Sequence, residues 1–342
     1  MNSFKKNIYR TVVDSIALLR YINITYPSGN IYRFQDDYYL STDYLYGFAG
    51  RRNSITKVPR STGIMSELAS VEPGGVGLHP YYNVAGDMFS NTFSGDIIKV
   101  TTAGVKTTQT SGLSARCTGY IAQTNGDIFF IESGSPSRVI KKTAAGTFSA
   151  VGNLPGAFPG GGTGYVSTIA PNGDMYFAGG IGGANNSLFK VTAAGAITTV
   201  ATWANTTYYI LDLEYHPDGY LIAGSSSSIS SIPNVLLKIT LSGVVTNIPY
   251  TGTGSTTDNI YGMCMGGTNL YVLFSCEAGV ANWSGVLRFD NNLIQQGLLE
   301  VPKSSVDAIG HDGLSFNSSD STLALTGTEY DVLYRIIEIS GF

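Results

Sequence analysis

Residues 165–201, YVSTIAPNGDMYFAGGIGGANNSLFKVTAAGAITTVA, decide the fold. Apolar and β-branched residues alternate with turn residues, and the pattern predicts four short strands, which we place at 166–170, 175–178, 188–191 and 196–200. Pro171-Asn172-Gly173-Asp174 is the first turn, and Ala194-Gly195 is the last. Hairpins this short hold no core alone, so the unit must stack on others like it.

The unit recurs along the chain, and two markers reveal it. The first is a turn followed by an apolar strand, at Asp36-Asp37-Tyr38, Gly86-Asp87-Met88, Gly126-Asp127-Ile128, Gly173-Asp174-Met175, Gly219-Tyr220-Leu221, Thr268-Asn269-Leu270 and Ser321-Thr322-Leu323. The second is a basic residue in a later strand, at Lys57, Lys99, Lys141, Lys190, Lys238, Arg288 and Arg335. Each marker appears seven times, at intervals of roughly 40 to 52 residues, and a four-stranded repeat of this length predicts a β-propeller.

The two ends of the chain suggest how such a ring would close. In the seventh unit the third strand, 333–339, runs almost to Phe342, so a fourth strand is missing. Residues 19–24 form an unassigned strand before the first unit, and pairing the two segments removes two open edges. We therefore predict an all-β fold: one propeller of seven four-stranded blades over residues 19–342, preceded by an arm at 1–18. Six blades is the alternative, because the first unit is the least regular and carries an insertion at 42–53.

Composition narrows the class of partner. Charged residues make up 13% of the chain, with 42 glycines, 22 tyrosines and a net charge of −4. No basic run favours nucleic acid, and no apolar run is long enough for a membrane span. Three cysteines without metal-ligand spacing predict neither zinc nor a disulfide framework. Arg10, Asp14 and Arg20 interrupt the segment that follows Lys5 and Lys6, which argues against a secretory signal peptide.

Residues 211–221, LDLEYHPDGYL, are similar to the core of an NHL-type repeat, and the KVTAAG segment of residues 190–195 extends the likeness. Gluconolactonase-like and virginiamycin B lyase-like propellers share this general repeat. The resemblance covers units two to six and implies blade architecture. It leaves function open, because one fold serves many functions.

The metal-dependent propellers of this kind would bring acidic, amide or imidazole side chains together at one end of the channel. Aligning the units by their turns places the candidates near the starts of inner strands: His79, Asp212, Asp258 or Asn259, His311 and Asp312. Such a set could hold a divalent cation. Each residue also has an ordinary role in a turn, and His216 stands where the repeat has a turn aspartate. We therefore expect no catalytic residue, no cofactor and no bound metal.

The sequence favours a non-enzymatic binding or structural protein, and we expect a bacteriophage virion or tail component. Loop or strand-end aromatics are the candidates for receptor or glycan contact, namely Tyr44, Tyr46, Tyr81, Tyr82, Tyr208, Tyr209 and Trp283. The alternative role for each is packing between blades. Apolar residues in 1–18 predict that the arm attaches to another virion protein. The competing hypotheses are a metal-dependent lactonase-like hydrolase, a virginiamycin B lyase-like enzyme, and a cytoplasmic interaction propeller.

Overall fold

The computed structural model describes residues 7–10, 16–23, 39–41, 43–49, 54–70, 81–82, 87–91, 96–110, 117–122, 125–132, 136–154, 166–179, 185–204, 208–227, 235–251, 258–276, 283–302, 311–329 and 333–342. Within these ranges the fold is all-β, with strands and turns and no helix. It follows that none of the described segments is a helix able to cross a membrane.

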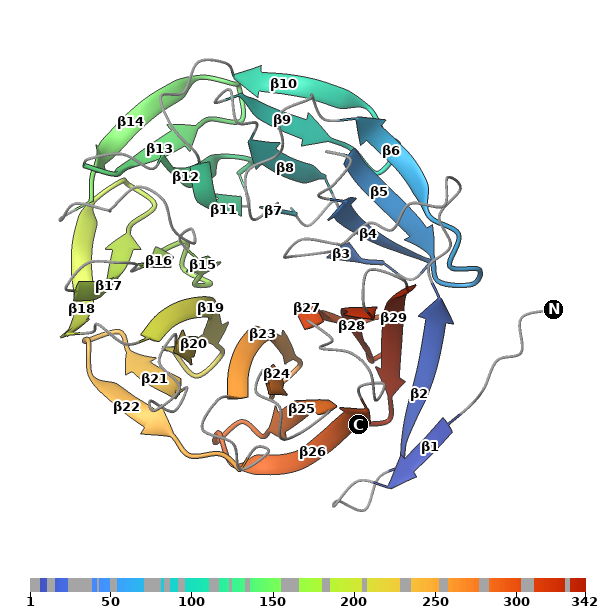
Figure 1. Cartoon of the computed structure of the whole chain (residues 1–342). Coiled ribbons are helices and arrows are strands. Elements are labelled where there is room, and N and C mark those ends of the chain that lie inside the picture. Colours follow the sequence, from blue (N-terminus) through green and yellow to red (C-terminus); the bar gives the residue numbers. More distant parts are fainter. Residues whose placement is uncertain are drawn as a thin grey trace. The chain divides into compact units, whose positions relative to one another are not determined.

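The described strands form seven antiparallel sheets, one for each predicted repeat (Figure 1). Sheet one contains β3 (Tyr39–Leu40), β4 (Tyr44–Ala49), β5 (Ser54–Pro59) and β6 (Ser66–Ser70). Sheet two contains β7 (Tyr81–Tyr82), β8 (Met88–Asn91), β9 (Ile97–Val100) and β10 (Lys106–Thr110). Sheet three contains β11 (Cys117–Ala122), β12 (Ile128–Glu132), β13 (Arg138–Lys142) and β14 (Phe148–Asn153).

The later sheets repeat the same order of strands. Sheet four contains β15 (Val166–Ile169), β16 (Met175–Gly179), β17 (Asn185–Val191) and β18 (Ile197–Ala204). Sheet five contains β19 (Tyr208–His216), β20 (Tyr220–Ser227), β21 (Leu236–Thr240) and β22 (Val245–Ile248). Sheet six contains β23 (Asp258–Gly266), β24 (Asn269–Cys276), β25 (Trp283–Phe289) and β26 (Gln295–Pro302). Sheet seven has five strands, β27 (His311–Asn317), β28 (Thr322–Glu329), β29 (Leu333–Ser340), β2 (Ile16–Asn23) and β1 (Asn7–Arg10).

The N-terminal strand β2 pairs with β29, as the sequence predicted, but sheet seven has five strands where four were predicted, because β1 adds to the outer edge of β2. β2 pairs antiparallel with β29, with Leu19 opposite Ile339 and Asn23 opposite Arg335 (Figure 1). β2 begins at Ile16, inside the predicted arm, and β1 folds back on it with Arg10 opposite Ile16. Part of the predicted arm at 1–18 therefore forms a hairpin of β1 and the start of β2.

The first repeat differs from the prediction. β4 lies inside residues 42–53, which we expected to be an insertion. The turn before β4 is closed by Ser41, whose backbone N–H donates to the Tyr44 carbonyl at 2.9 Å and whose Oγ accepts from the Tyr44 N–H at 3.0 Å. Leu40, which follows the predicted turn at Asp37, belongs to the first strand of the sheet and pairs with Leu45. The first repeat is therefore regular, and its turn had been placed too early.

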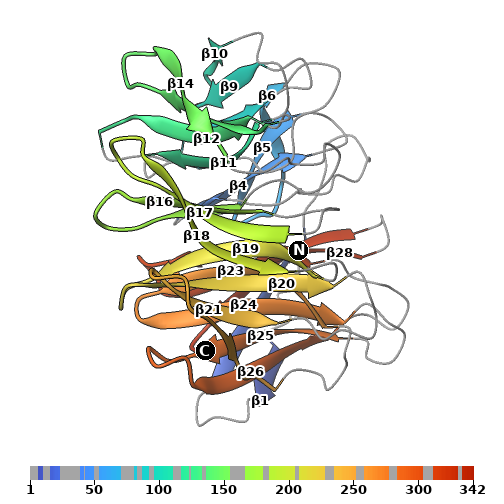
Figure 2. The ribbon, with the colours of Figure 1, turned by 90° about the vertical axis from the view of Figure 1, so that its left-hand side faces the viewer.

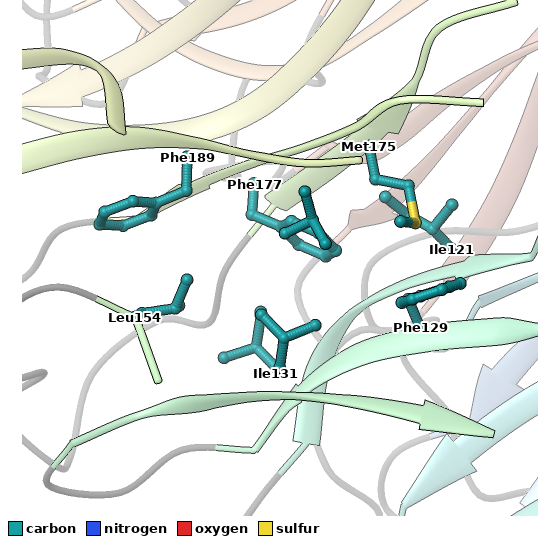
Figure 3. Packing of buried hydrophobic residues seen from close by; sticks show 9 residues of the cluster. Ile121, Phe129, Ile131, Leu154, Met175, Phe177 and Phe189 are labelled. Carbon is teal, nitrogen blue, oxygen red and sulfur yellow. The ribbon is translucent and has the colours of Figure 1, made fainter. Parts of the chain in front are cut away.

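Contacts divide the chain into two compact units. Unit 1 holds residues 1–67, 224–236 and 248–342, and unit 2 holds 68–223 and 237–247. In unit 1 the core joins sheets six and seven through Tyr271, Leu273, Val286, Leu299, Leu323, Leu325 and Ile339. In unit 2 the core joins sheets three and four. Figure 3 shows Phe177, Phe189 and Met175 of sheet four facing side chains from the third repeat, Ile121, Phe129, Ile131 and Leu154.

Glycines in unit 2 fix how each sheet meets the one before it. Gly243 has φ +90°, and a Cβ there would lie 2.2 Å from the carbonyl oxygen of Val200 on β18. Gly104 and Gly195, also at positive φ, approach the preceding sheet in the same way, since an added Cβ would lie 2.8 Å from the Leu68 oxygen and 3.0 Å from Val151, respectively. These turns therefore need glycine both for its backbone conformation and for the space. Gly146 is the exception, because nothing lies within 4 Å of its Cβ position.

Candidate functional site

Each sheet has two chemically different ends. The turns that join its first strand to its second, and its third strand to its fourth, lie together at what we call the turn end. The remaining connections lie at the opposite loop end, since neighbouring strands are antiparallel. Figure 2 shows β16, β17 and β18 running between these two ends. The described part of the chain contains most of the turn ends and much less of the loop ends, so the site is built mainly from the turn ends.

Three turn ends carry the same ion pair. Asp87, Asp127 and Asp174 stand just before the second strand of their sheets, and each reaches a lysine of the third strand. The Nζ–Oδ2 distances are 2.6 Å to Lys99, 2.7 Å to Lys141 and 2.5 Å to Lys190. These lysines belong to the second sequence marker, which in sheets two, three and four records a cross-strand salt bridge.

In two of these ion pairs the pKa of one partner is shifted away from neutrality. The hydrogen bond from Lys141 holds the pKa of Asp127 below its usual value, and the Ala144 N–H donates to the other carboxylate oxygen at 3.0 Å. In sheet four the hydrogen bond to Asp174 raises the pKa of Lys190. A charged pair of this kind neither gives nor takes a proton readily near pH 7. The ion pair instead holds the second and third strands of the sheet together.

Two sheets replace the aspartate by tyrosine and keep the lysine. Lys57 Nζ lies 5.2 Å from the centre of the Tyr44 ring, and Lys238 Nζ lies 3.9 Å from that of Tyr220. A cation over an aromatic face takes the place of the salt bridge. Tyr44, predicted as a binding residue, is thus half-buried at the turn end of sheet one. Its neighbour Tyr46 is 7% exposed inside β4, so its ring packs in the sheet and presents no area to a ligand.

His216 lies in the core and contacts the same Tyr220 ring that Lys238 contacts. Its ring stacks on Tyr220 with centroids 4.2 Å apart and planes 9° apart, and the side chain is fully buried. Nδ1 accepts a hydrogen bond from the Asp218 N–H at 3.2 Å, while Nε2 has no partner in the described part of the chain. Burial lowers the pKa of this imidazole, against the opposing charge of Asp218. His216 therefore serves the turn as a neutral side chain.

A different cluster lies at the loop end of sheet three. Glu132 ends β12 and is 2% exposed, and it forms an ion pair with Nε of Arg138 at the start of β13. Cys117, opposite Glu132 on β11, is fully buried. Burial, together with the Glu132 charge, raises the pKa of its thiol well above the usual range. A thiol held protonated is a poor nucleophile, so this cluster is a neutralised pair beside an inert cysteine.

Sequence reasoning missed Glu132 and Arg138. A signal was present, because Glu132 is the only charged residue of the strand IFFIE and Arg138 follows six positions later. Two cross-strand neighbours of a hairpin with that spacing can pair. The glutamate was overlooked because the repeat markers lie at the opposite end of the sheet.

Most of the other predicted site residues fall partly or wholly outside the described residues. Tyr81 and Tyr82 form β7, Tyr208 and Tyr209 begin β19, Trp283 begins β25, and His311 and Asp312 begin β27, each described by its backbone alone. His79 lies outside the described residues altogether. The Asp212 carboxylate accepts a hydrogen bond from the Leu213 N–H at 2.8 Å. The described residues bring together no group of three metal-ligating side chains.

Comparison with known proteins shows the fold. No family model matches the chain, and no curated protein matches it. A solved streptogramin B lyase superposes with a TM-score of 0.66 at 19% identity, covering 95% of this chain and 98% of that one. Kuenenia stuttgartiensis hydrazine synthase gives 0.66 at 16% identity, with 91% and 97% covered. Oligogalacturonate lyase from Vibrio parahaemolyticus gives 0.62 at 11%, with 98% of each chain covered. The chain has a propeller-like repeat architecture, and identities this low carry no function.

Proposed function

We propose that the chain is a single seven-bladed propeller closed by β2 and that it works as a non-enzymatic binding or structural protein. Seven sheets with the same order of strands support the blade number. The pairing of β2 with β29 supports closure of the seventh blade. In unit 1, β27 contacts β3 of sheet one and β23 of sheet six, as consecutive blades would.

The observation that carries a binding role is how the chain uses its ionisable side chains. At three turn ends an aspartate is paired with a lysine, and at the loop end of sheet three Glu132 is paired with Arg138. The pKa of Asp127 is lowered and that of Lys190 raised, so neither suits general acid–base catalysis. These residues stabilise the scaffold and leave recognition to the uncharged surface.

The setting we propose is a bacteriophage virion or tail, as the sequence predicted. The proposed partners are other virion proteins at the N-terminal hairpin and a receptor or glycan at the aromatic residues. Support comes from the hairpin itself: β1 is the outermost strand of sheet seven, with no second neighbour among the described strands. An edge of this kind can accept a strand from another chain.

Two measurements test the proposal. The purified protein is incubated with a lactone and with a streptogramin B, with and without Mg²⁺, using heat-denatured protein as the blank. We expect no turnover above the blank. Metal-dependent turnover that His311→Ala abolishes would replace the binding role by the lyase or lactonase hypothesis. In parallel, the full chain and a chain lacking residues 1–15 are followed through density-gradient purification of particles, and only the full chain should travel with them.

A further inference from the structure

One core position of the repeat holds a lysine in sheet three. Lys142 is the last residue of β13, it pairs with Ile128, and it is 8% exposed. At the matching position the other six sheets have apolar side chains that are at most 1% exposed, namely Val58, Val100, Val191, Ile239, Phe289 and Ile339. A charged side chain at this position breaks a rule that the six other repeats keep. Departures of this kind are expected at functional sites.

Lys142 faces the core between sheets two and three. Successive residues of a strand point to opposite faces, so Lys142 shares its face with Ile140 and not with Lys141. The buried cluster on that face joins the two sheets through Phe89, Ile97, Cys117, Ile128, Phe130 and Ile140. Phe148, the partner of Lys142 on β14, packs against the same cluster. The stem of Lys142 therefore lies among apolar side chains, at the turn end of the sheet.

The acidic side chains at this end of sheets two and three are already paired with other lysines. The connections there, residues 83–87, 101–105, 123–127 and 143–147, contain two acidic residues, Asp87 and Asp127. Lys99 holds the first at 2.6 Å and Lys141 holds the second at 2.7 Å. Within the described part of the chain, Nζ of Lys142 has neither a hydrogen bond nor an ion pair. Its charged form therefore has no counter-ion of its own.

The surroundings of Lys142 favour the neutral amine. Burial lowers its pKa and the charge of Lys99 lowers it further, while Asp127 acts in the opposite direction. Lys99 Nζ lies 5.9 Å from the centre of the Phe89 ring, which belongs to the core that Lys142 faces. Lys106, the other basic residue at this end of sheet two, is exposed. A lysine that is desolvated and stands beside another cation is activated as a nucleophile.

We propose that Lys142 is a reactive amine that forms a Schiff base with a small aldehyde. The lone pair of Nζ attacks the carbonyl carbon, the two amine protons leave with the carbonyl oxygen as water, and a C=N bond remains. Imine formation needs only the neutral amine, with no oxidant or reductant. The 8% exposure of Lys142 limits the reagent to a small one. This site is independent of the proposed binding or structural role, and it is read out by labelling.

The first test uses formaldehyde as the aldehyde, with cyanoborohydride to reduce the imine to a stable methylamine. The full chain is treated at pH 7, and tandem mass spectrometry of its peptides follows the initial rate at each lysine, with Lys141 resolved from Lys142. We expect Lys142 to react about ten times faster than Lys106. Because Lys106 is exposed, accessibility alone predicts the reverse order. A Lys142 that is labelled no faster than Lys106 overturns the proposal.

A Lys142→Val variant verifies the assignment of the fast site. Valine is the residue that sheets one, two and four have at this position, so the variant should fold. It should lose the fast phase of labelling and keep the rates of the other lysines. A fast phase that persists in this variant belongs to another amine and overturns the proposal.

The last test asks whether the site itself causes the reactivity. Lys99→Met removes the neighbouring cation and leaves the Asp87 charge, which favours the ammonium form of Lys142, so the rate at Lys142 should fall severalfold. The matched control is Lys190→Met, which removes the corresponding ion-pair lysine of sheet four and should leave that rate unchanged. Melting curves verify that both variants are folded. Equal rates at Lys142 in the two variants would contradict the proposal.

Discussion

Arg60 and Asp320, 260 residues apart in the chain, meet with Nη1 and Oδ2 2.8 Å apart. Arg60 is 7% exposed and also donates to the Ser41 carbonyl at 3.2 Å, so one guanidinium joins the turn ends of sheets one and seven. Burial acts to raise the pKa of Asp320, but hydrogen bonds from Arg60 and Thr322 outweigh it and the pKa is lowered. This pair links the first repeat to the last within unit 1.

Removing one member of this pair should destabilise the protein. We expect Arg60→Ala to lower the free energy of unfolding by about 1–2 kcal/mol, because Asp320 is partly exposed and water takes over some of the lost bond. A double-mutant cycle with Asp320→Ala, followed by urea denaturation, isolates the pair. A coupling energy indistinguishable from zero would show that the two side chains contribute independently.

Loss of the N-terminal strand should open sheet seven. Deleting residues 1–23 removes β2 and leaves the backbone of β29 without the six residues, Leu18–Asn23, that pair with it. Losing those hydrogen bonds should cost about 3–6 kcal/mol. Deleting residues 1–15 removes only β1, which pairs through four residues, and should cost less, about 2–4 kcal/mol. If the two deletions melt at the same temperature, β2 does not support the sheet.

The sequence predicted the repeats because their signals are local. A turn, an apolar strand and a lysine recur, and the lysine proves to be one half of a cross-strand pair in sheets two, three and four. The first repeat was misread because Tyr44 stands where aspartate stands elsewhere, and its role appears only when Lys57 is seen over the ring. The marker at Arg335 was also misplaced. In sheet seven Leu323 pairs with Ile339, and the residue before Ile339 is Glu338. Glu338 therefore stands at the position that lysine occupies in sheets two, three and four.

The candidate site was harder to predict than the fold. Tyr46 is an aromatic residue near a turn, and nothing in its sequence neighbourhood distinguishes a buried ring from an exposed one. Glu132 and Arg138 lie six residues apart, and their pairing depends on the hairpin register. Burial and register are properties of the packed sheet, which a residue pattern does not contain.

Two glycines with the same backbone conformation should respond differently to the same substitution. Gly243→Ala and Gly146→Ala both place a side chain at φ near +90°, which costs about 1–2 kcal/mol. Only at Gly243 does the new methyl meet the Val200 oxygen, so we expect a further loss of about 1–3 kcal/mol. Denaturant titration of both variants gives the difference. Equal losses would mean that the turn moves away from β18 without cost.

His216 should make stability depend on pH. Burial lowers the folded-state pKa of His216, so the unfolded chain takes up a proton more readily than the folded one. Its contribution is complete above the unfolded pKa of about 6.5 and is lost as pH falls below that value. Asparagine is the residue at the matching position of sheet seven, Asn317. The His216→Asn variant should therefore show a smaller change in the free energy of unfolding between about pH 7.5 and 5.5. An unchanged slope would assign the dependence to other groups.

The pairing of β2 with β29 has a consequence for synthesis. In unit 2 the turns at Gly104, Gly195 and Gly243 dock on segments that the ribosome has already released, so these sheets can settle in order. β2 cannot do this, since its partner begins at Leu333. At usual elongation rates β2 waits about 15–60 s for it. β2 can pair with β1 at once, but its other edge is among the last to be covered, and that edge is open to other nascent chains throughout the interval.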